Sequence, residues 1–170
     1  MATLFFESNK PVGSLAPNRY DKVLAIGAII LLAAALIAIA KGHADWARVP
    51  ALVWAHLITI LIATALTPYM LLRPRGTRQH RTLGKVWVVA MIATAGISLF
   101  VKVIHPGHFS VIHLLSVFTL IMAPRVWLTA RAHQVAKHRS AVRGLVTGAL
   151  LVAGFFTFPF GRMLGTWLFG

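Results

Sequence analysis

The chain has 170 residues, of which 58% are hydrophobic, with a mean hydropathy of +0.79 and a formal net charge of +14 at pH 7. A soluble domain of this length cannot bury that much apolar surface, so the composition excludes an ordinary soluble protein and predicts an integral membrane protein. Because the sequence contains no cysteine, disulfide bonds, thiolate metal sites and iron–sulfur clusters are also excluded.

The sequence predicts an all-α protein with five transmembrane helices. Residues 1–22 are expected to form a short cytoplasmic arm, because Pro11 and Pro17 disfavour a regular helix and the segment lacks the sustained apolar core of a signal peptide. Residues 23–170 then form a single transmembrane domain, since each of its apolar runs can cross about 30 Å of hydrocarbon as a helix. The expected helices are approximately 23–40, 51–72, 78–104, 109–128 and 138–160.

The 17 lysines and arginines are distributed unequally between the two sides of this topology. The N-terminal arm and the loops after the second and fourth helices hold most of them, and by the positive-inside rule that side is cytoplasmic. The prediction is a multi-pass protein of the bacterial inner membrane, with its N-terminus in the cytoplasm and its C-terminus in the periplasm. The charge is therefore explained by orientation and contact with the lipid bilayer, and no nucleic-acid partner is expected.

Two copies of one pattern occupy the middle of the chain. His56-Leu57 is followed 24 residues later by His80-Arg81, and His113-Leu114 is followed 25 residues later by His138-Arg139. In each copy an apolar run with a proline leads to a basic turn. The repeat predicts a duplicated helical hairpin, with helices two to five forming a pseudo-twofold four-helix bundle and helix one outside it.

The topology places these four histidines at two depths. His56 and His113 would lie near the outer side, and His80 and His138 near the inner side. A pair of imidazoles on facing helices supplies the two axial ligands of a b-type haem. Cationic side chains beside each pair could bind the haem propionates. The expected propionate partners are Arg81, Arg139, Lys85 and Arg143 at the inner pair, and Arg162 and Lys102 at the outer pair.

The preferred function is transmembrane electron transfer through one or two b haems, with the quinone pool as a candidate partner. Two alternatives remain open. The histidines could be structural, in a cofactor-free accessory subunit of a larger membrane complex or in a homodimer. The outer histidines could instead bind zinc or copper, which both accept imidazole ligands; the candidate ligands are His105, His108 and His113, with His43 and Asp45 opposite. No catalytic residues are expected, because none of the three acids is near a membrane serine.

Several runs of the sequence also resemble a known family. They are Gln79–Val88 (QHRTLGKVWV), Phe109–Val117 (FSVIHLLSV), His138-Arg139 and Pro159–Gly165 (PFGRMLG). Over residues 50–166 the chain looks like the DUF 2306 family of bacterial membrane proteins of unknown function, which supports the architecture and names no activity.

The helix arrangement is similar to that of cytochrome b-561 proteins, whose haem ligands pair helix two with four and helix three with five. This resemblance implies the pairs His56/His113 and His80/His138. The two histidines of each hairpin are closer in sequence here than in that family, which places His80 and His138 at the membrane edge. If a single haem is bound, the sequence therefore favours the outer pair.

Overall fold

The computed structural model describes residues 16–101 and 111–170, and all regular elements in these two ranges are helical. The first helices are α1 (Arg19–Lys41), the 3-10 helix η1 (Gly42–Arg48), α2 (Ala51–Leu72), α3 (Arg78–Phe100) and α4 (Val111–Arg131). They are followed by α5 (Val135–Leu145), the π-helix η2 (Val146–Val152), α6 (Ala153–Phe155) and α7 (Met163–Phe169). Within the described ranges, four helical segments are long and apolar enough to cross a membrane: Arg19–Arg48, Ala51–Leu72, Arg78–Phe100 and His113–Arg131. The prediction of a multi-pass, all-helical membrane protein is thus confirmed.

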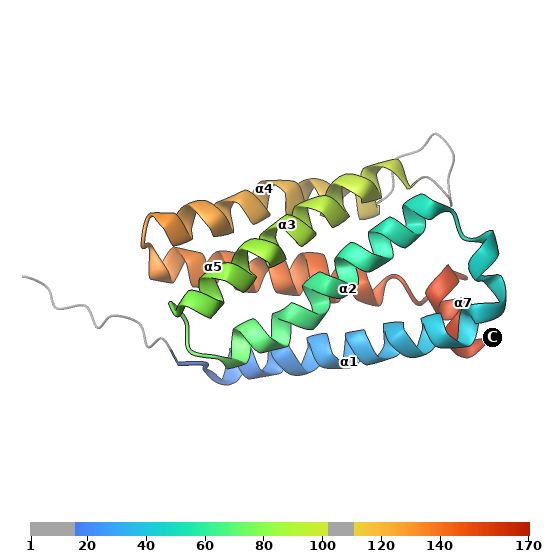
Figure 1. Ribbon diagram of the computed structural model, residues 1–170, viewed down its shortest axis with the longest axis horizontal. Coiled ribbons are helices and arrows are strands. Elements are labelled where there is room, and N and C mark those ends of the chain that lie inside the picture. Colours follow the sequence, from blue (N-terminus) through green and yellow to red (C-terminus); the bar gives the residue numbers. More distant parts are fainter. Residues whose placement is uncertain (1–15, 102–110) are drawn as a thin grey trace, which may run out of the picture.

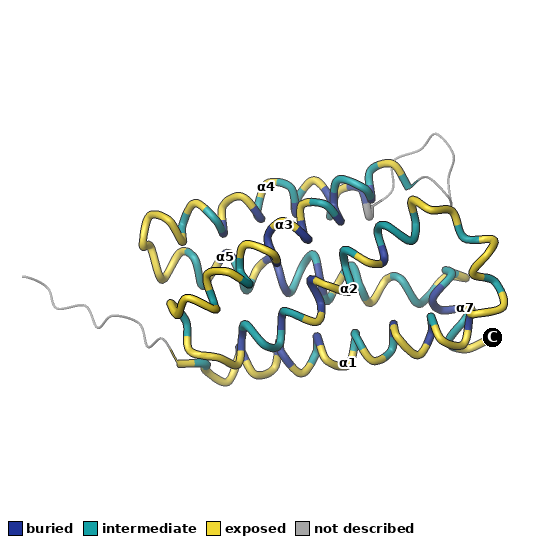
Figure 2. Tube along the Cα trace, viewed as in Figure 1, coloured by how far each residue is buried: buried dark blue, intermediate teal, exposed yellow. Residues whose placement is uncertain are grey.

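The long helices form a bundle in which neighbours in sequence are neighbours in space. Each helix from α1 to α5 contacts the next, and η2 returns to α1 and closes the ring (Figure 1). Small and aliphatic side chains fill the interior, including Ala28, Ala63, Met91 and Leu145. The outward faces are largely exposed (Figure 2) and carry large apolar side chains. Apolar residues on both the inside and the outside of a helical bundle are typical of a protein surrounded by lipid.

Helix α1 begins at Arg19, four residues before the predicted start. The Asn18 side chain accepts a hydrogen bond from the Asp21 backbone N–H at 3.0 Å, and the Asp21 carboxylate accepts one from the Asn18 N–H at 3.0 Å. This reciprocal capping box satisfies two backbone donors at the helix start. The prediction that residues up to 22 belong to a non-helical arm is therefore wrong from Arg19 onward.

The last long helix is a composite of α5, η2 and α6, and it runs without a break from Val135 to Phe155. The predicted helix, 138–160, started three residues too late and ended five residues too late. The chain reverses at Phe160 and Gly161, whose φ angles are 64° and 66°, and α7 then packs against α1 and η1.

The other helix bounds agree more closely with the prediction. Helix α2 matches it, and α4 ends at Arg131, three residues beyond the predicted end. Helix α3 ends at Phe100 rather than at residue 104, and residues 102–104 and 109–110 of the predicted third and fourth helices lie outside the described residues.

The docking of α7 depends on close backbone approach at Gly165. A Cβ at this position would lie 1.7 Å from the carbonyl oxygen of Phe158, so Gly165→Ala is expected to displace α7 and to cost about 1–3 kcal/mol of stability. Thermal unfolding in detergent and proteolysis of the C-terminus would measure the effect. Gly96→Ala is the matched control, because no atom lies within 4 Å of its added Cβ; it should be neutral or stabilising. Equal behaviour of the two variants would contradict the observed packing of α7.

Candidate functional site

A cavity of about 710 Å³, here called the central cavity, lies at the end of the bundle that carries the α2–α3 and α4–α5 turns. Residues of α1, α2, α3, α4, α5 and η2 all contribute to its walls. Its volume is within the range of about 300–1,000 Å³ that is typical of small-molecule sites. The central cavity is therefore the candidate ligand-binding site.

The walls of the central cavity combine positive charge with apolar surface. Six cations line it: Arg75, Arg81, Lys85, Arg131, Arg139 and Arg143. Asp21 is the acid among its described lining residues, which leaves a formal excess of five positive charges when the histidines are neutral. The apolar part of the lining includes Leu71, Trp87, Val88, Val126 and Trp127. This combination favours a ligand that is both anionic and amphipathic.

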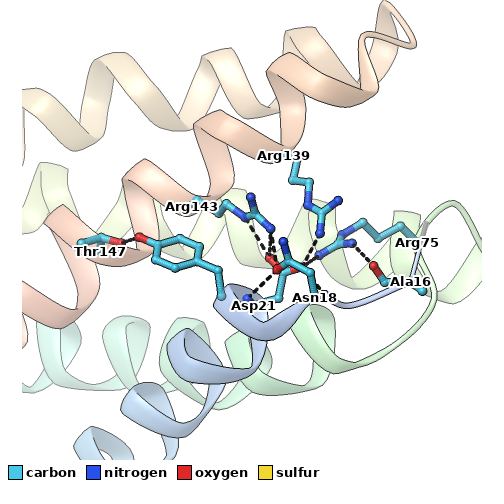
Figure 3. A network of polar contacts seen from close by, with 8 residues as sticks. Ala16, Asn18, Asp21, Arg75, Arg139, Arg143 and Thr147 are labelled. Atoms are coloured by element: carbon cyan, nitrogen blue, oxygen red, sulfur yellow. Dashed lines mark hydrogen bonds and ion pairs between the residues drawn. The ribbon is translucent and has the colours of Figure 1, made fainter. Parts of the chain in front are cut away.

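Asp21 holds three arginines from two other parts of the chain at the wall of this cavity (Figure 3). Its side chain is fully buried, and Oδ2 accepts hydrogen bonds from Nη2 of Arg75 at 2.7 Å and Nη2 of Arg139 at 2.8 Å. Oδ1 accepts from Nε of Arg143 at 2.9 Å. Arg75 lies in the α2–α3 turn, and the other two arginines lie on α5. One carboxylate therefore fixes the α2–α3 turn and α5 to the start of α1. We call these four residues the Asp21 cluster.

Further contacts hold the Asp21 cluster in one geometry. Arg143 donates from Nη2 to Oδ1 of Asn18 at 2.7 Å and lies 5.2 Å from the centroid of the Tyr20 ring. The Tyr20 hydroxyl is in turn 3.2 Å from Oγ1 of Thr147 (Figure 3). Arg75 donates from Nη1 to the carbonyl of Ala16 at 3.2 Å. The three arginine side chains are thus held by contacts within the protein and do not extend away from its surface.

The sequence analysis did not identify Asp21 as a site residue. Its signal was present but weak: Asn18 and Asp21 have the spacing of a helix capping box, and few acids were available to neutralise the nearby cations. Arg139 was expected to contact a ligand, and it lines the cavity while also pairing with Asp21.

His80 and His138 both line the central cavity. The backbone N–H of His80 donates to Oγ1 of Thr77 at 3.1 Å, so Thr77 is the N-cap of α3. Nδ1 of His138 donates to the carbonyl of Val126 at 3.0 Å, and this bond leaves Nε2 as its lone-pair nitrogen. Nδ1 of His80 is buried and has no hydrogen-bond partner within the described part of the chain. Arg81, also a predicted site residue, lies exposed on the lining.

His56 and His113 do not line the central cavity. Nδ1 of His56 donates to the Thr94 carbonyl at 3.2 Å, and the Thr94 hydroxyl donates to the Thr59 hydroxyl at 2.8 Å. His113 is buried on α4, one turn before Ser116, which donates to Ser98 of α3 at 3.0 Å. Interhelical hydrogen bonds of this kind stabilise packing in membranes. The hydrogen bond from His56 to Thr94 therefore favours a structural role for this histidine.

The remaining predicted site residues that the structure describes are not part of the cavity lining, and Lys102 lies outside the described residues. Arg162 is the half-buried N-cap of α7 and is not part of the cavity lining. His105 and His108 lie outside the described residues. Nδ1 of His43 donates to the carbonyl of Ala40, and Asp45 pairs with Arg48. In residues 16–101 and 111–170 there is no group of three or more His, Asp or Glu side chains that could hold a metal ion.

Comparison with known proteins found no matching family model and no significantly similar curated protein or solved structure. The fold and the site themselves define the class: a multi-pass helical membrane protein whose bundle has a partly open, cationic and amphipathic cavity at one end.

Proposed function

We propose that the central cavity binds one b-type haem, with His80 and His138 as the axial ligands, and that the chain is a membrane electron-transfer protein. The observation that supports this proposal is that two imidazoles from different helices line one cavity that is both apolar and strongly cationic. When bound, a haem supplies one-electron redox chemistry. The contribution of the chain is to hold the group, orient it and exclude water.

Features of the cavity lining support this proposal. The bond from His138 to the Val126 carbonyl fixes its imidazole in the tautomer that can ligate iron through Nε2. The buried Nδ1 of His80 favours a partner that the described residues do not provide. Met70 and Trp127 offer an apolar surface, and the cations of the lining can hold the two propionates.

This proposal differs from the sequence-based hypothesis in the number and place of the haems. The sequence favoured His56 and His113 over the pair at the membrane edge. The Nδ1 bond of His56 to Thr94 and the position of both outer histidines away from the cavity now favour one haem at His80 and His138. One haem at one end of the bundle does not connect the two membrane faces. We therefore propose electron exchange near that end, with quinol in the bilayer as a candidate donor.

We also propose the topology that the charge distribution predicts. The composite helix Val135–Phe155 is long enough, at about 1.5 Å per residue, to provide a fifth crossing. With five crossings, the two basic turns and the start of α1 lie together, and the positive-inside rule assigns that side to the cytoplasm of a bacterial cell. We propose as well that α2–α3 and α4–α5 are two copies of one helical hairpin.

A reduced-minus-oxidised visible spectrum of the protein, purified in mild detergent from cells with adequate haem supply, tests the proposal. The expected result is one haem per chain in a pyridine haemochrome assay, with a Soret band that shifts on reduction. Two haems per chain would contradict the single site and support His56 and His113 as a second pair. A colourless protein that co-purifies with stoichiometric partners would replace the proposal with the cofactor-free accessory subunit.

A further inference from the structure

The Asp21 cluster contains more positive charge than its own carboxylate can balance. Three guanidinium groups converge on one carboxylate, so the cluster carries a formal excess of two positive charges. Both carboxylate oxygens are engaged. Oδ1 accepts from Arg143, and Oδ2 accepts from two arginines and from the Asn18 N–H at 3.0 Å. The side chains of Arg75, Arg139 and Arg143 are only 10%, 19% and 24% exposed, so water screens them incompletely.

The surroundings of the Asp21 cluster increase this excess. Arg81, Lys85 and Arg131 line the same cavity, and Lys85 lies 6.0 Å from the centroid of the Trp127 ring. These three side chains are exposed, so water screens them more than the cluster, but among the described lining residues only Asp21 carries a negative charge, and the net positive charge attracts an anion. The half-buried apolar side chains of Met70, Trp127 and Val142 line the same cavity.

We infer that the Asp21 cluster is a binding site for a second acid group, the carboxylate or phosphate of an amphiphile whose apolar part lies along Met70, Trp127 and Val142. The inference rests on the proposed function only in using the same cavity, and it requires neither iron nor histidine. Two sources share the chemistry: a propionate of a porphyrin, and the phosphate of an anionic membrane lipid. Arginine suits both, because its planar guanidinium binds carboxylate and phosphate through paired N–H donors.

Asp21 then acts as the resident anion of this site. It positions the three arginines, and its own negative charge repels the incoming acid group. Asp21→Asn keeps a side-chain oxygen that can accept hydrogen bonds and removes that charge. The removal of one negative charge a few ångströms away is expected to strengthen the binding of an acidic ligand about tenfold. If the cluster had only a structural role, the same substitution would leave binding unchanged or weaken it.

The binding experiment uses the full chain in a non-ionic detergent and two metal-free probes, protoporphyrin IX and its dimethyl ester. The two probes share the macrocycle and differ in their acid groups, and their binding is followed by porphyrin fluorescence. The free acid should bind at least tenfold more tightly than the ester. Arg81→Gln combined with Arg131→Gln, which leaves the Asp21 cluster intact, should weaken the acid several-fold and leave the ester unchanged. Arg125→Gln is the matched control, because Arg125 is exposed and does not line the cavity.

The source of the acid group is identified by a second titration with dibrominated phosphatidylglycerol and dibrominated phosphatidylcholine, which quench tryptophan fluorescence on contact. Saturable quenching by the anionic lipid alone, reversed by protoporphyrin IX, would assign the site to lipid phosphate. Selective binding of protoporphyrin IX without such quenching would assign it to a porphyrin propionate.

Two results would overturn the inference: equal affinity for the acid and the ester, or weaker binding of the acid by Asp21→Asn. If Asp21→Asn does not fold, Arg143→Gln decides, because it removes one guanidinium of the cluster and should weaken binding of the acid several-fold while leaving the ester unchanged. Unchanged binding of the acid by this variant would overturn the inference. The proposed function is tested separately with the His80→Ala/His138→Ala variant, which should still bind metal-free protoporphyrin IX. Loss of haem ligation in this variant with retained binding of the metal-free acid separates the two proposals.

Discussion

Replacing Asp21 with alanine is expected to lower the free energy of unfolding by about 3–5 kcal/mol, the range observed when one partner of a buried ion pair is removed. The Asp21 side chain is fully buried and its three arginines are mostly buried, so the substitution leaves cations close together in a poorly solvated place. The capping box at the start of α1 is lost as well, which contributes about 1 kcal/mol of the effect. The α2–α3 turn and α5 lose their common tie to α1.

Asp45 provides the matched control for this substitution. It pairs with Arg48 three residues later, but the side chains are 47% and 84% exposed, respectively. Such surface pairs contribute at most about 1 kcal/mol, so Asp45→Ala should be nearly neutral. Unfolding of both variants by denaturing detergent in mixed micelles would measure the difference. Equal stability of the two variants would show that the Asp21 cluster does not hold the bundle together.

The membrane class and much of the helical pattern could be predicted because their signals are local. Long apolar runs identify helices whatever their neighbours are, and Pro50 and Pro74 bracket α2 closely enough to give both of its ends. The end of the last helix could not be predicted in this way. It depends on the reversal at Phe160 and on the contact of Gly165 with the Phe158 carbonyl, which form only when α7 packs back on the bundle.

The candidate site shows the same division between local and distant information. The spacing of the histidines led to His80 and His138, but it could not show which rings line a common cavity, because one residue of register turns a helical side chain by about 100°. The partners of Asp21 are 54, 118 and 122 residues away in the sequence. No local pattern encodes such contacts. The preference for His56 and His113 came from the expected position of His80 and His138 at the membrane edge. The Thr94 carbonyl supplies His56 with a partner that the sequence did not reveal.

Alanine at His80 or at His138 is expected to abolish the low-spin haem spectrum, whereas alanine at His56 is expected to retain it. Each of the first two substitutions removes one imidazole from the wall of the central cavity, and the second imidazole alone cannot provide six-coordinate ligation. His56→Ala removes a hydrogen bond between α2 and α3 and should cost about 1 kcal/mol of stability without loss of haem. The spectrum and the haem content of each variant, measured after the same purification, test the assignment.

Free imidazole distinguishes ligation from a structural role at these two positions. The truncated side chain leaves space beside the cavity, so added imidazole should enter it and restore the low-spin spectrum of His80→Ala and His138→Ala. A histidine that merely supports the fold would not be rescued in this way, because imidazole in solution cannot restore a contact between helices that have moved apart. Loss of haem in His56→Ala, together with a normal spectrum in His80→Ala, would instead return the haem to the outer pair. The central cavity would then be left to the acidic amphiphile alone.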